Sequence, residues 1–334
     1  MIPESIGKYR IVAPLGQGRV GIVFRARDTE DGRAVALKLI PANHFGTPEA
    51  KQKFLEEAHA AAGLAHPHLR QLYEAGESGD QVFLAMEYLD GSTLRSLLVG
   101  WPVEPEAALE WGAEIADALA AAHAEGVAHG ELTTGKVFIT EQGMVKLLDA
   151  GLWRLEVQSG RDLRDAAALR ESGLEPLAVA VLAPEQIRGA EPDARSDLFA
   201  LGAVLYQMCT GVQPFAHDDA NQTMHWVLGR QPEPPSRMNP RVPPALDVLL
   251  ACLLEKEPAR RLSSAAETVA ALRAVAAGEA LPASVTEAPP AEMVAPAAEA
   301  APAKAGSRLL YWVISGGVVL AGLLWLLYRT LMQP

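Results

Sequence analysis

The segment VAHGELTTGKVFIT at residues 127–140, followed by VKLLDAG at 145–151, decides how this chain folds. An alanine-rich segment at 107–124 precedes it and has the composition of a helix. Apolar runs flank the short sequence EQG at 141–143, which predicts a tight hairpin. A polar loop held between a helix and a hairpin is a usual place for catalytic groups, because rigid elements fix its side chains. We therefore expect the functional residues at 129–136.

The composition narrows the class of protein. The 334 residues, 49% of them hydrophobic, are enough for one large domain or two smaller ones. The net charge of −12 argues against a nucleic-acid-binding protein, which would carry a basic face. Cys209 and Cys252 lie in apolar helical contexts, so we expect buried free thiols in a reducing compartment. The N-terminal sequence MIPESIGKYR has no apolar run and predicts no signal peptide.

An uncharged segment lies near the C-terminus, at residues 309–328. A helix of this length spans about 30 Å, the thickness of a bilayer core. Arg308 and Arg329 bracket it, and Trp312 and Trp325 lie near its ends, as at membrane interfaces. The alternative is a buried core helix, but no partner elements follow it. We therefore predict one transmembrane helix at 309–328 and a short tail at 329–334.

A glycine-rich loop, GQGRVG at 16–21, lies near the N-terminus between two predicted strands. In a dinucleotide-binding fold the third glycine would open a helix. Here Gly21 instead leads into the β-rich sequence IVFR, and a further predicted strand at 34–40 carries Lys38. A lone strand lysine would be read as a solvated residue, but the glycine loop followed by Lys38 at this spacing resembles the glycine-rich loop and strand lysine of protein kinases, which implies a phosphate-binding role.

Several separated motifs together resemble those of the protein kinase family. HGELTTGK at 129–136 occupies the positions of the family's His-Arg-Asp-Leu-Lys-Pro-x-Asn catalytic loop. DAG at 149–151 matches Asp-Phe-Gly, and APE at 183–185 matches Ala-Pro-Glu. The resemblance covers about residues 9–275 and is strongest to bacterial Ser/Thr kinases with a single membrane span. It implies an α+β, two-lobed fold, with an N-lobe at 9–86 and a C-lobe at 89–275.

The resemblance also implies an ATP- or ADP-binding pocket that is nearly complete. Lys38 would hold the α- and β-phosphates, and Glu57 would pair with it from the following helix, predicted at 48–64. Glu57 lies on the edge of that helix's apolar stripe (Phe54, Ala58, Ala61, Ala65), whereas Glu56 points away. Phe138 falls where the family has an aliphatic residue beneath adenine, so its ring either crowds the pocket or stacks on the base. The nucleotide-binding positions that the resemblance assigns are Gly16, Gly18, Gly21, Val23, Ala36, Lys38, Glu57, Glu87, Leu89 and Phe138.

The phosphoryl-transfer half of the site departs from the family pattern. Glu131 replaces the base aspartate and is one methylene longer, and a misplacement of about 1 Å can cost 10²-fold in rate. Thr133 replaces the lysine that faces the transferred phosphate. Lys136 replaces the asparagine of the second Mg²⁺ site; it would either repel a metal there or substitute for that metal against the phosphates. Asp149 remains as a ligand for Mg²⁺, so we expect one ion at most.

Two further substitutions accompany these. Gly130 replaces the arginine that receives a phosphorylated activation loop, and Ala150 replaces the phenylalanine of Asp-Phe-Gly. Features that the family uses for folding are kept. By resemblance, His129 is structural, Asp197 opens the helix at 198–210, and Arg261 pairs with Glu185.

The changes concentrate on one mechanism while the folding devices remain, which favours a pseudokinase that works in signalling by binding protein partners. One alternative is an active Ser/Thr kinase that uses Glu131 as its base. Another is a different nucleotide chemistry, such as nucleotidyl transfer.

The remaining segments set the expected organisation of the chain. Residues 278–307 are rich in Ala, Pro and Glu, which predicts a disordered linker to the membrane helix. Lys304 and Arg308 precede that helix, so we expect a single-pass inner-membrane protein with the kinase-like domain cytoplasmic and the tail outside. Gly317 and Ala321 offer a small-residue face compatible with a homodimer.

Overall fold

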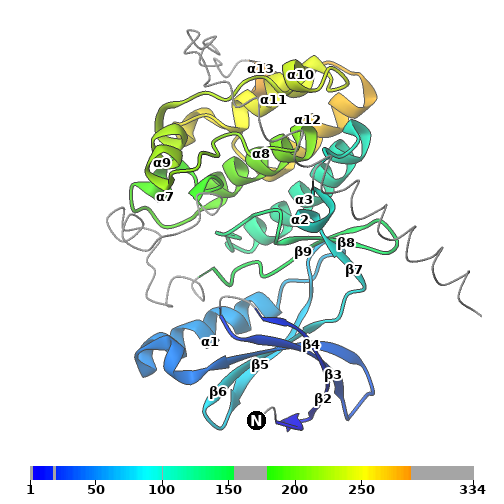
Figure 1. The fold of residues 1–334 in the computed structure, drawn as a ribbon, viewed down its shortest axis with the longest axis vertical. Helices are drawn as coiled ribbons and strands as arrows, with labels where there is room; N and C mark the ends of the chain where they lie inside the picture. The colour runs from blue at the N-terminus through cyan, green and yellow to red at the C-terminus, as the bar shows by residue number, and fades with distance from the viewer. Residues whose placement is uncertain (1–2, 18–19, 100, 154–178, 287–334) are drawn as a thin grey trace, which may run out of the picture. The chain divides into compact units, whose positions relative to one another are not determined.

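The structure is a computed structural model that describes residues 3–17, 20–99, 101–153 and 179–286, all within one compact unit. The smaller lobe is an antiparallel six-stranded sheet in the order β1-β2-β3-β4-β6-β5, with one long helix, α1 (Figure 1). Its elements are β1 (Ser5–Ile6), β2 (Tyr9–Gln17), β3 (Ile22–Asp28), β4 (Ala34–Pro41), η1 (Ala42–Phe45), α1 (Pro48–Ala62), β5 (Leu72–Ser78) and β6 (Gln81–Glu87).

Both faces of this sheet are buried. On one face Ile40 and Leu84 pack with Phe54 and Ala58 of α1, and on the other Leu37 and its neighbours form a separate cluster with Tyr9, Phe24, Phe83 and Ala85. The central strand β4 is therefore buried along nearly its whole length, and Lys38 is the only charged residue in it.

The larger lobe is mostly helical and adds a second, three-stranded sheet in the order β7-β8-β9. Its elements are β7 (Gly91–Thr93), α2 (Leu94–Leu97), α3 (Pro105–Ala124), β8 (Val137–Thr140), β9 (Val145–Leu147), α7 (Pro184–Ile187), α8 (Ala194–Thr210), α9 (Ala220–Gly229), α10 (Pro235–Met238), α11 (Pro244–Leu253), η2 (Pro258–Arg260), α12 (Ala265–Ala277) and α13 (Ala283–Thr286). The predicted two-lobed α+β fold is confirmed.

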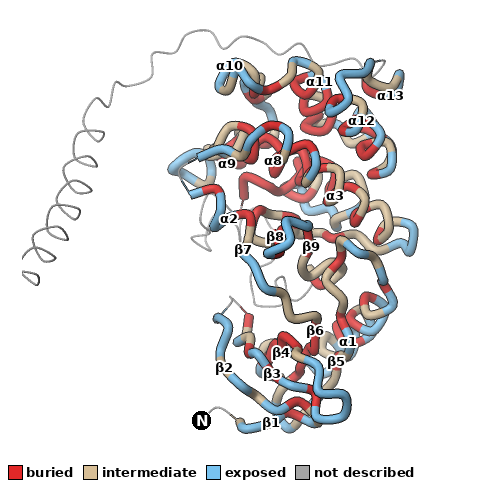
Figure 2. Tube along the Cα trace, turned by 90° about the vertical axis from the view of Figure 1, so that its right-hand side faces the viewer, coloured by how far each residue is buried: buried red, intermediate tan, exposed pale blue. Residues whose placement is uncertain are grey.

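Helices α3 and α8 form the centre of the larger lobe, and Figure 2 shows buried residues along both. The predicted apolar face of α3 is buried at every position: Leu109, Gly112, Ile115, Ala116, Leu119 and Ala122. A Cβ at Gly112 would lie 2.4 Å from Leu205 Cδ2 on α8, so the two helices can approach this closely only because Gly112 has no side chain. Cys209 and Cys252 are buried free thiols, as predicted.

Three local predictions were wrong. Helix α1 ends at Ala62 rather than at residue 64, so Ala65 is exposed and leaves the apolar stripe. Helix α8 begins at Ala194, and its N-cap is Asp193; Asp197 lies inside the first turn and is buried. Strand β7 was not predicted, because the residues GST at 91–93 are of types common at helix caps. They form a strand because they pair with β8.

The chain keeps its structure past residue 278, where the linker was predicted to begin. Helix α13 follows, and its Val285 is buried in the core of the larger lobe. Within the residues that the structure describes, no helix is long and apolar enough to cross a bilayer. The linker beyond residue 286, the predicted membrane helix at 309–328 and the tail at 329–334 lie outside the described residues.

Candidate functional site

The loop at 129–136 connects α3 to β8, and the buried carboxylate of Asp197 fixes its start. The backbone amides of His129 and Gly130 donate to the two oxygens of Asp197, at 2.7 and 2.8 Å. His123 at the end of α3 contacts the same carboxylate at 2.8 Å. Asp197 thus fixes the backbone of the loop and is not a reacting group. This structural role explains why it is buried inside α8.

His129 has a structural role. Its Nδ1 accepts the amide hydrogen of Glu131 at 3.2 Å, and its Nε2 lies 3.0 Å from the carbonyl oxygen of Leu148. Burial lowers the pKa of His129, so the ring is neutral at pH 7 and Nε2 carries the proton. The histidine therefore ties the loop to the strand that leads to Asp149.

Asp149 is held between two cations. Lys136 Nζ lies 2.8 Å from Asp149 Oδ2, and the Arg70 guanidinium donates from Nη2 to Oδ1. Burial alone would raise the pKa of this carboxyl, but the charges of Lys136, Arg70 and Lys38 hold it well below its usual range. Asp149 is the one non-glycine residue with positive φ (60°) in the described part of the chain. Such a strained backbone conformation persists only where the surrounding structure enforces it.

The backbone explains how Arg70 reaches Asp149 from the smaller lobe. The chain at 68–70 runs beside β9: His68 O accepts from Leu147 N at 2.8 Å, and Arg70 N donates to Leu147 O at 3.0 Å. Leu147 precedes Asp149 by two residues, so the same pairing brings the Arg70 side chain alongside the carboxylate. Arg70 Nη2 also lies 3.0 Å from Met86 Sδ.

A small pocket lies behind Asp149. Arg70 and Ala150 both line it, together with Ala61, Leu64, Leu69, Leu72, Met86 and Leu152. The walls are largely apolar, so the guanidinium in this pocket is paired with Asp149 rather than hydrated. Ala150, which stands where the family has phenylalanine, and Arg70 therefore line the same pocket.

The residues at 131–136 contact one another instead of leaving space for reacting groups. Glu131 Oε2 lies 4.0 Å from Lys136 Nζ, so Lys136 stands between two carboxylates. The Thr133 hydroxyl accepts the amide hydrogen of Gly135 at 3.2 Å and closes a tight turn.

A divalent cation does not fit this arrangement. Mg²⁺ binds carboxylate oxygens at about 2.1 Å. On Asp149 it would stand beside both Lys136 and Arg70, which already donate to the two oxygens. At about 4 Å, two unit charges repel by about 4 kcal/mol at an effective dielectric of about 20, and a divalent ion doubles this. The prediction that Asp149 holds Mg²⁺ therefore meets an electrostatic obstacle that its own motif does not reveal.

Several of the predicted nucleotide residues lie in the smaller lobe. Lys38 is buried on β4 and pairs in register with Val23 on β3, and Ala36 is buried on the same strand. Glu57 is half-buried on α1 while Glu56 is exposed, as the helix projection predicted. Gly16 lies next to the end of β2, which is Gln17, whereas Gly18 lies outside the described part of the chain.

Gly21 has a specific structural requirement. Its φ is +76°, and a Cβ there would lie 2.0 Å from the carbonyl oxygen of Leu39 on β4. Only glycine allows the returning strand to pass this close.

The segment between the lobes is anchored by Glu87. Its carboxylate accepts from Lys146 Nζ on β9 at 2.8 Å and from the amide of Gln71 at 3.2 Å. Leu89 is half-buried. Phe138 on β8 lies against this segment, because a Cβ at Gly91 would lie 2.9 Å from its Cε1.

Gly130 and Trp153 are packed together. Gly130 has a φ of +78°, and a Cβ there would lie 2.6 Å from Trp153 Cγ and Cδ1. The indole occupies the place of any side chain at position 130, so the absence of arginine here is built into the packing.

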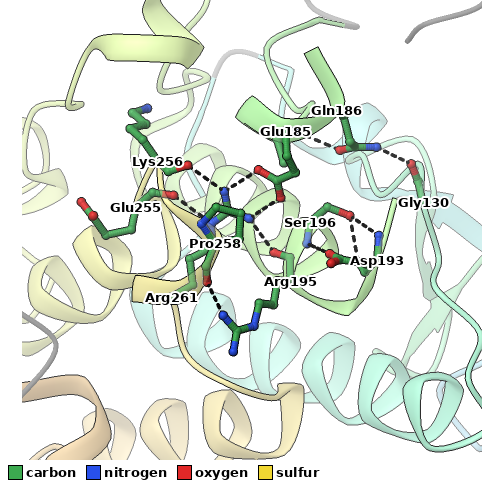
Figure 3. A network of polar contacts seen from close by, with 11 residues as sticks. Gly130, Glu185, Gln186, Asp193, Arg195, Ser196, Glu255, Lys256, Pro258 and Arg261 are labelled. Carbon is green, nitrogen blue, oxygen red and sulfur yellow. Dashed lines mark hydrogen bonds and ion pairs between the residues drawn. The ribbon is translucent and has the colours of Figure 1, made fainter. Parts of the chain in front are cut away.

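The predicted pair between Glu185 and Arg261 is confirmed (Figure 3). Arg261 Nη1 and Nη2 donate to the two oxygens of Glu185 at 2.6 and 2.8 Å, and the Arg261 side chain is fully buried. Gln186 beside it donates to the carbonyl oxygen of Gly130 at 3.2 Å, which links this network to the catalytic loop.

Sequence reasoning missed Arg70 and Trp153. The available signal for Arg70 was a lone cation in the short sequence LRQL at 69–72, between two leucines. For Trp153 the sequence carries no signal, because its contact with Gly130 depends on the turn that follows Asp149.

Comparisons with known proteins agree with this geometry. Residues 9–272 match the family model for the protein kinase domain. A probable serine/threonine-protein kinase of Streptomyces coelicolor is 35% identical over 266 residues, which cover 78% of this chain and 39% of that protein. Serine/threonine-protein kinase PknB of Mycolicibacterium smegmatis is 34% identical over 278 residues, which cover 82% of this chain and 44% of that protein. The match thus spans less than half the length of these two relatives.

The crystal structure of the Mycobacterium tuberculosis PknI kinase domain has the same fold, with a TM-score of 0.64 and 24% sequence identity. The superposition covers 80% of this chain and 96% of that domain.

Proposed function

Since the chain belongs to the protein kinase domain family, we propose that it binds ATP or ADP and acts in signalling as a pseudokinase, a scaffold or regulator without effective phosphoryl transfer. One observation carries the proposal: both carboxylate oxygens of Asp149 accept from protein cations, Arg70 and Lys136. In the family that aspartate holds the metal for transfer.

The other positions of the catalytic loop support the same proposal. Thr133 has no charge to offer a transferred phosphate and closes a turn with Gly135. Gly130 is packed against Trp153, so no basic residue receives a phosphorylated loop from that position. The fold-preserving contacts of Asp197 and of Arg261 are complete, as expected for a domain kept for binding.

The second candidate function is an active Ser/Thr kinase that uses Glu131 as its base. The observation in its favour is the loop's intact backbone, fixed by Asp197 and His129. Glu131 is still a carboxylate at the base position and lies 4.0 Å from Lys136.

Labelled-ATP incorporation into the purified chain and a generic protein substrate separates the two candidates. We expect no transfer above the background of Asp149→Ala. Robust incorporation that is lost in both Asp149→Ala and Glu131→Gln would establish the active kinase instead.

Nucleotide binding has its own test. ATP or ADP should raise the melting temperature of the chain by linkage, and Lys38→Met should abolish that rise. The exposed Lys53→Met on α1 is the matched control and should keep it. A wild-type chain that shows no shift at millimolar nucleotide, with or without Mg²⁺, would contradict the binding proposal.

The proposal includes a tether to the inner membrane through residues 309–328, with the kinase domain in the cytoplasm and unidentified proteins as its signalling partners. Its support is the uncharged segment bracketed by Arg308 and Arg329. The chain should resist carbonate extraction, and a version ending at Ser307 should not. Digestion of the kinase domain by protease added to intact spheroplasts would overturn the orientation.

A further inference from the structure

The cluster around Asp149 has an unusual charge balance. It contains two carboxylates, Asp149 and Glu131, and two cations that pair with them, Arg70 and Lys136, and the charge of Lys38 also acts on Asp149. The carboxylates are mostly shielded from water, with side-chain exposures of 14% each. Their charges must therefore be balanced within the protein or by a bound ion.

The two added cations carry together the charge of one divalent metal ion. A pair of carboxylates would repel a neighbouring polyphosphate. A divalent cation would then be needed to bridge the carboxylates and the phosphates. Here Arg70 occupies one oxygen of Asp149 and Lys136 the other. Lys136 also faces Glu131, so one ammonium group lies between both carboxylates.

We propose that this site binds the phosphates of ATP or ADP without a divalent cation, with Arg70 and Lys136 supplying the positive charge that a metal ion would bring. The inference rests on the nucleotide binding proposed above and defines its chemistry: the ligand is the metal-free nucleotide. Lys136 shields both carboxylates from the phosphates, and Arg70 is the positioning residue that neutralises Asp149 from behind.

Arg70 suits this role because it is built into the structure. Its guanidinium is held in the pocket behind Asp149, against Met86 Sδ at 3.0 Å. Its backbone is fixed beside Leu147 by a hydrogen bond of 3.0 Å. A guanidinium stays charged at all physiological pH values, so this compensation does not depend on pH.

The direct test is the dissociation constant for ATP and for ADP, measured by calorimetry on the purified chain in EDTA and again in Mg²⁺. We expect Mg²⁺ to leave the dissociation constant unchanged or to raise it, because Mg²⁺ draws the free nucleotide into a complex that this site does not favour. Tightening by Mg²⁺ of about tenfold or more would overturn the inference while leaving the proposed nucleotide binding in place. Absence of binding in both buffers would instead overturn the proposed function itself.

The sign of the Asp149→Asn effect gives a second test. If Asp149 held a metal, losing its charge would weaken binding by about tenfold or more. Under our inference the substitution removes a negative charge from the phosphate site, so the dissociation constant in EDTA should stay the same or fall. The asparagine is isosteric and keeps an acceptor for Lys136. A rise in the dissociation constant of about tenfold would contradict the inference.

A double variant, Arg70→Leu with Lys136→Asn, should make the site depend on metal. We expect binding in EDTA to weaken by about tenfold or more, and Mg²⁺ to recover most of it. The matched control is Arg241→Leu with Lys53→Asn, which makes the same chemical changes at two exposed positions and should behave as wild type.

Circular dichroism and a thermal melt check that the double variant folds. If it does not, Mn²⁺ titration of the wild-type chain, followed by loss of the free-ion resonance signal, decides. We expect no site that binds Mn²⁺ at submillimolar concentration, with or without ADP, and such a site would refute the inference.

Discussion

The guanidinium of Arg70 and the carboxylate of Asp149 form a direct ion pair across 79 positions of sequence. Both side chains are mostly buried, with exposures of 12% and 14%. The pair joins the segment that leads into β5 of the smaller lobe to the turn after β9 of the larger one. The two lobes are thus tied together by a direct ion pair beside the loop at 129–136.

The Arg261–Glu185 pair should dominate the stability of the larger lobe. Arg261 also donates to the carbonyl oxygens of Glu255 and Arg195, at 2.8 and 2.9 Å, so its loss leaves several buried acceptors unpaired. Arg261→Leu should lower the free energy of unfolding by about 3–5 kcal/mol, measured by urea denaturation. The control is Arg241→Leu, which breaks an exposed pair with Glu104 and should cost at most about 1 kcal/mol. Equal losses for the two variants would show that Arg261 is no anchor.

Lys256 should make stability depend on pH. Burial, and next the charge of Arg261, lower the pKa of its ammonium group from 10.5 to about 7. Its Nζ lies 3.9 Å from the centre of the Phe215 ring, which favours the cation but does not offset burial. Between about pH 7 and 10.5 the unfolded chain therefore binds more protons at this site than the folded one. Stability should rise with pH across that window, by at most about 1.4 kcal/mol per pH unit.

Lys256→Met removes the titrating group and should remove this contribution. The difference in unfolding free energy between wild type and Lys256→Met should change in favour of wild type from pH 7 to 10. Lys53→Met, at an exposed position of α1, serves as the control and should run parallel to wild type. Parallel curves for Lys256→Met as well would mean that Lys256 titrates normally in the folded chain.

Restoring phosphoryl transfer should require Arg70 as well as the catalytic loop. The triple change Glu131→Asp, Thr133→Lys and Lys136→Asn rebuilds the loop but leaves Arg70 on Asp149. Adding Arg70→Leu frees that carboxylate for Mg²⁺. We expect labelled-ATP incorporation to be weak in the triple variant and higher in the quadruple one, whose gain over wild type reaches about 10²-fold or more. Equal activity of the two variants would show that Arg70 does not limit Asp149.

Gly130→Ala should be destabilising for two separable reasons. The positive φ of +78° costs an alanine about 1–2 kcal/mol, and its Cβ would also clash with Trp153. Gly126→Ala is a matched control, because Gly126 has a φ of +73° with nothing within 4 Å of an added Cβ. In a double-mutant cycle measured by urea denaturation, Trp153→Ala should recover the steric cost that the indole causes; the conformational part and the close approach to Cβ of residue 153, 2.9 Å from an added Cβ, remain. Equal costs at Gly126 and Gly130 would contradict the packing role of Trp153.

Much of the fold could be predicted from the sequence because its signals are local and periodic. The apolar spacing on α3 and the EQG turn before β9 each depend on residues within a few positions of one another. Strand β7 was missed because Gly91–Thr93 is extended only through its partner Phe138–Thr140 on β8. The start of α8 was predicted at the wrong residue because aspartate is a common helix cap. Asp197 instead accepts a hydrogen bond from the backbone amide of His129 in the distant loop.

The candidate site divides in the same way. Lys38 and Glu131 were assigned to the site because each lies in a motif of fixed spacing, and Glu57 because of its place on the helix projection. Arg70 was not found, because its partner Asp149 is set by a single parallel bridge between Leu69 and Leu147, which no local pattern encodes. Long-range pairs of buried charges must therefore be read from the fold.

The contact between Gly130 and Trp153 also couples these two positions in any redesign of the loop. An arginine at position 130 needs the space that the indole fills. Arginine at 130 alone would clash with the indole, and a smaller residue at 153 alone would leave a void. A variant that places a basic side chain at position 130 therefore has to change both positions together.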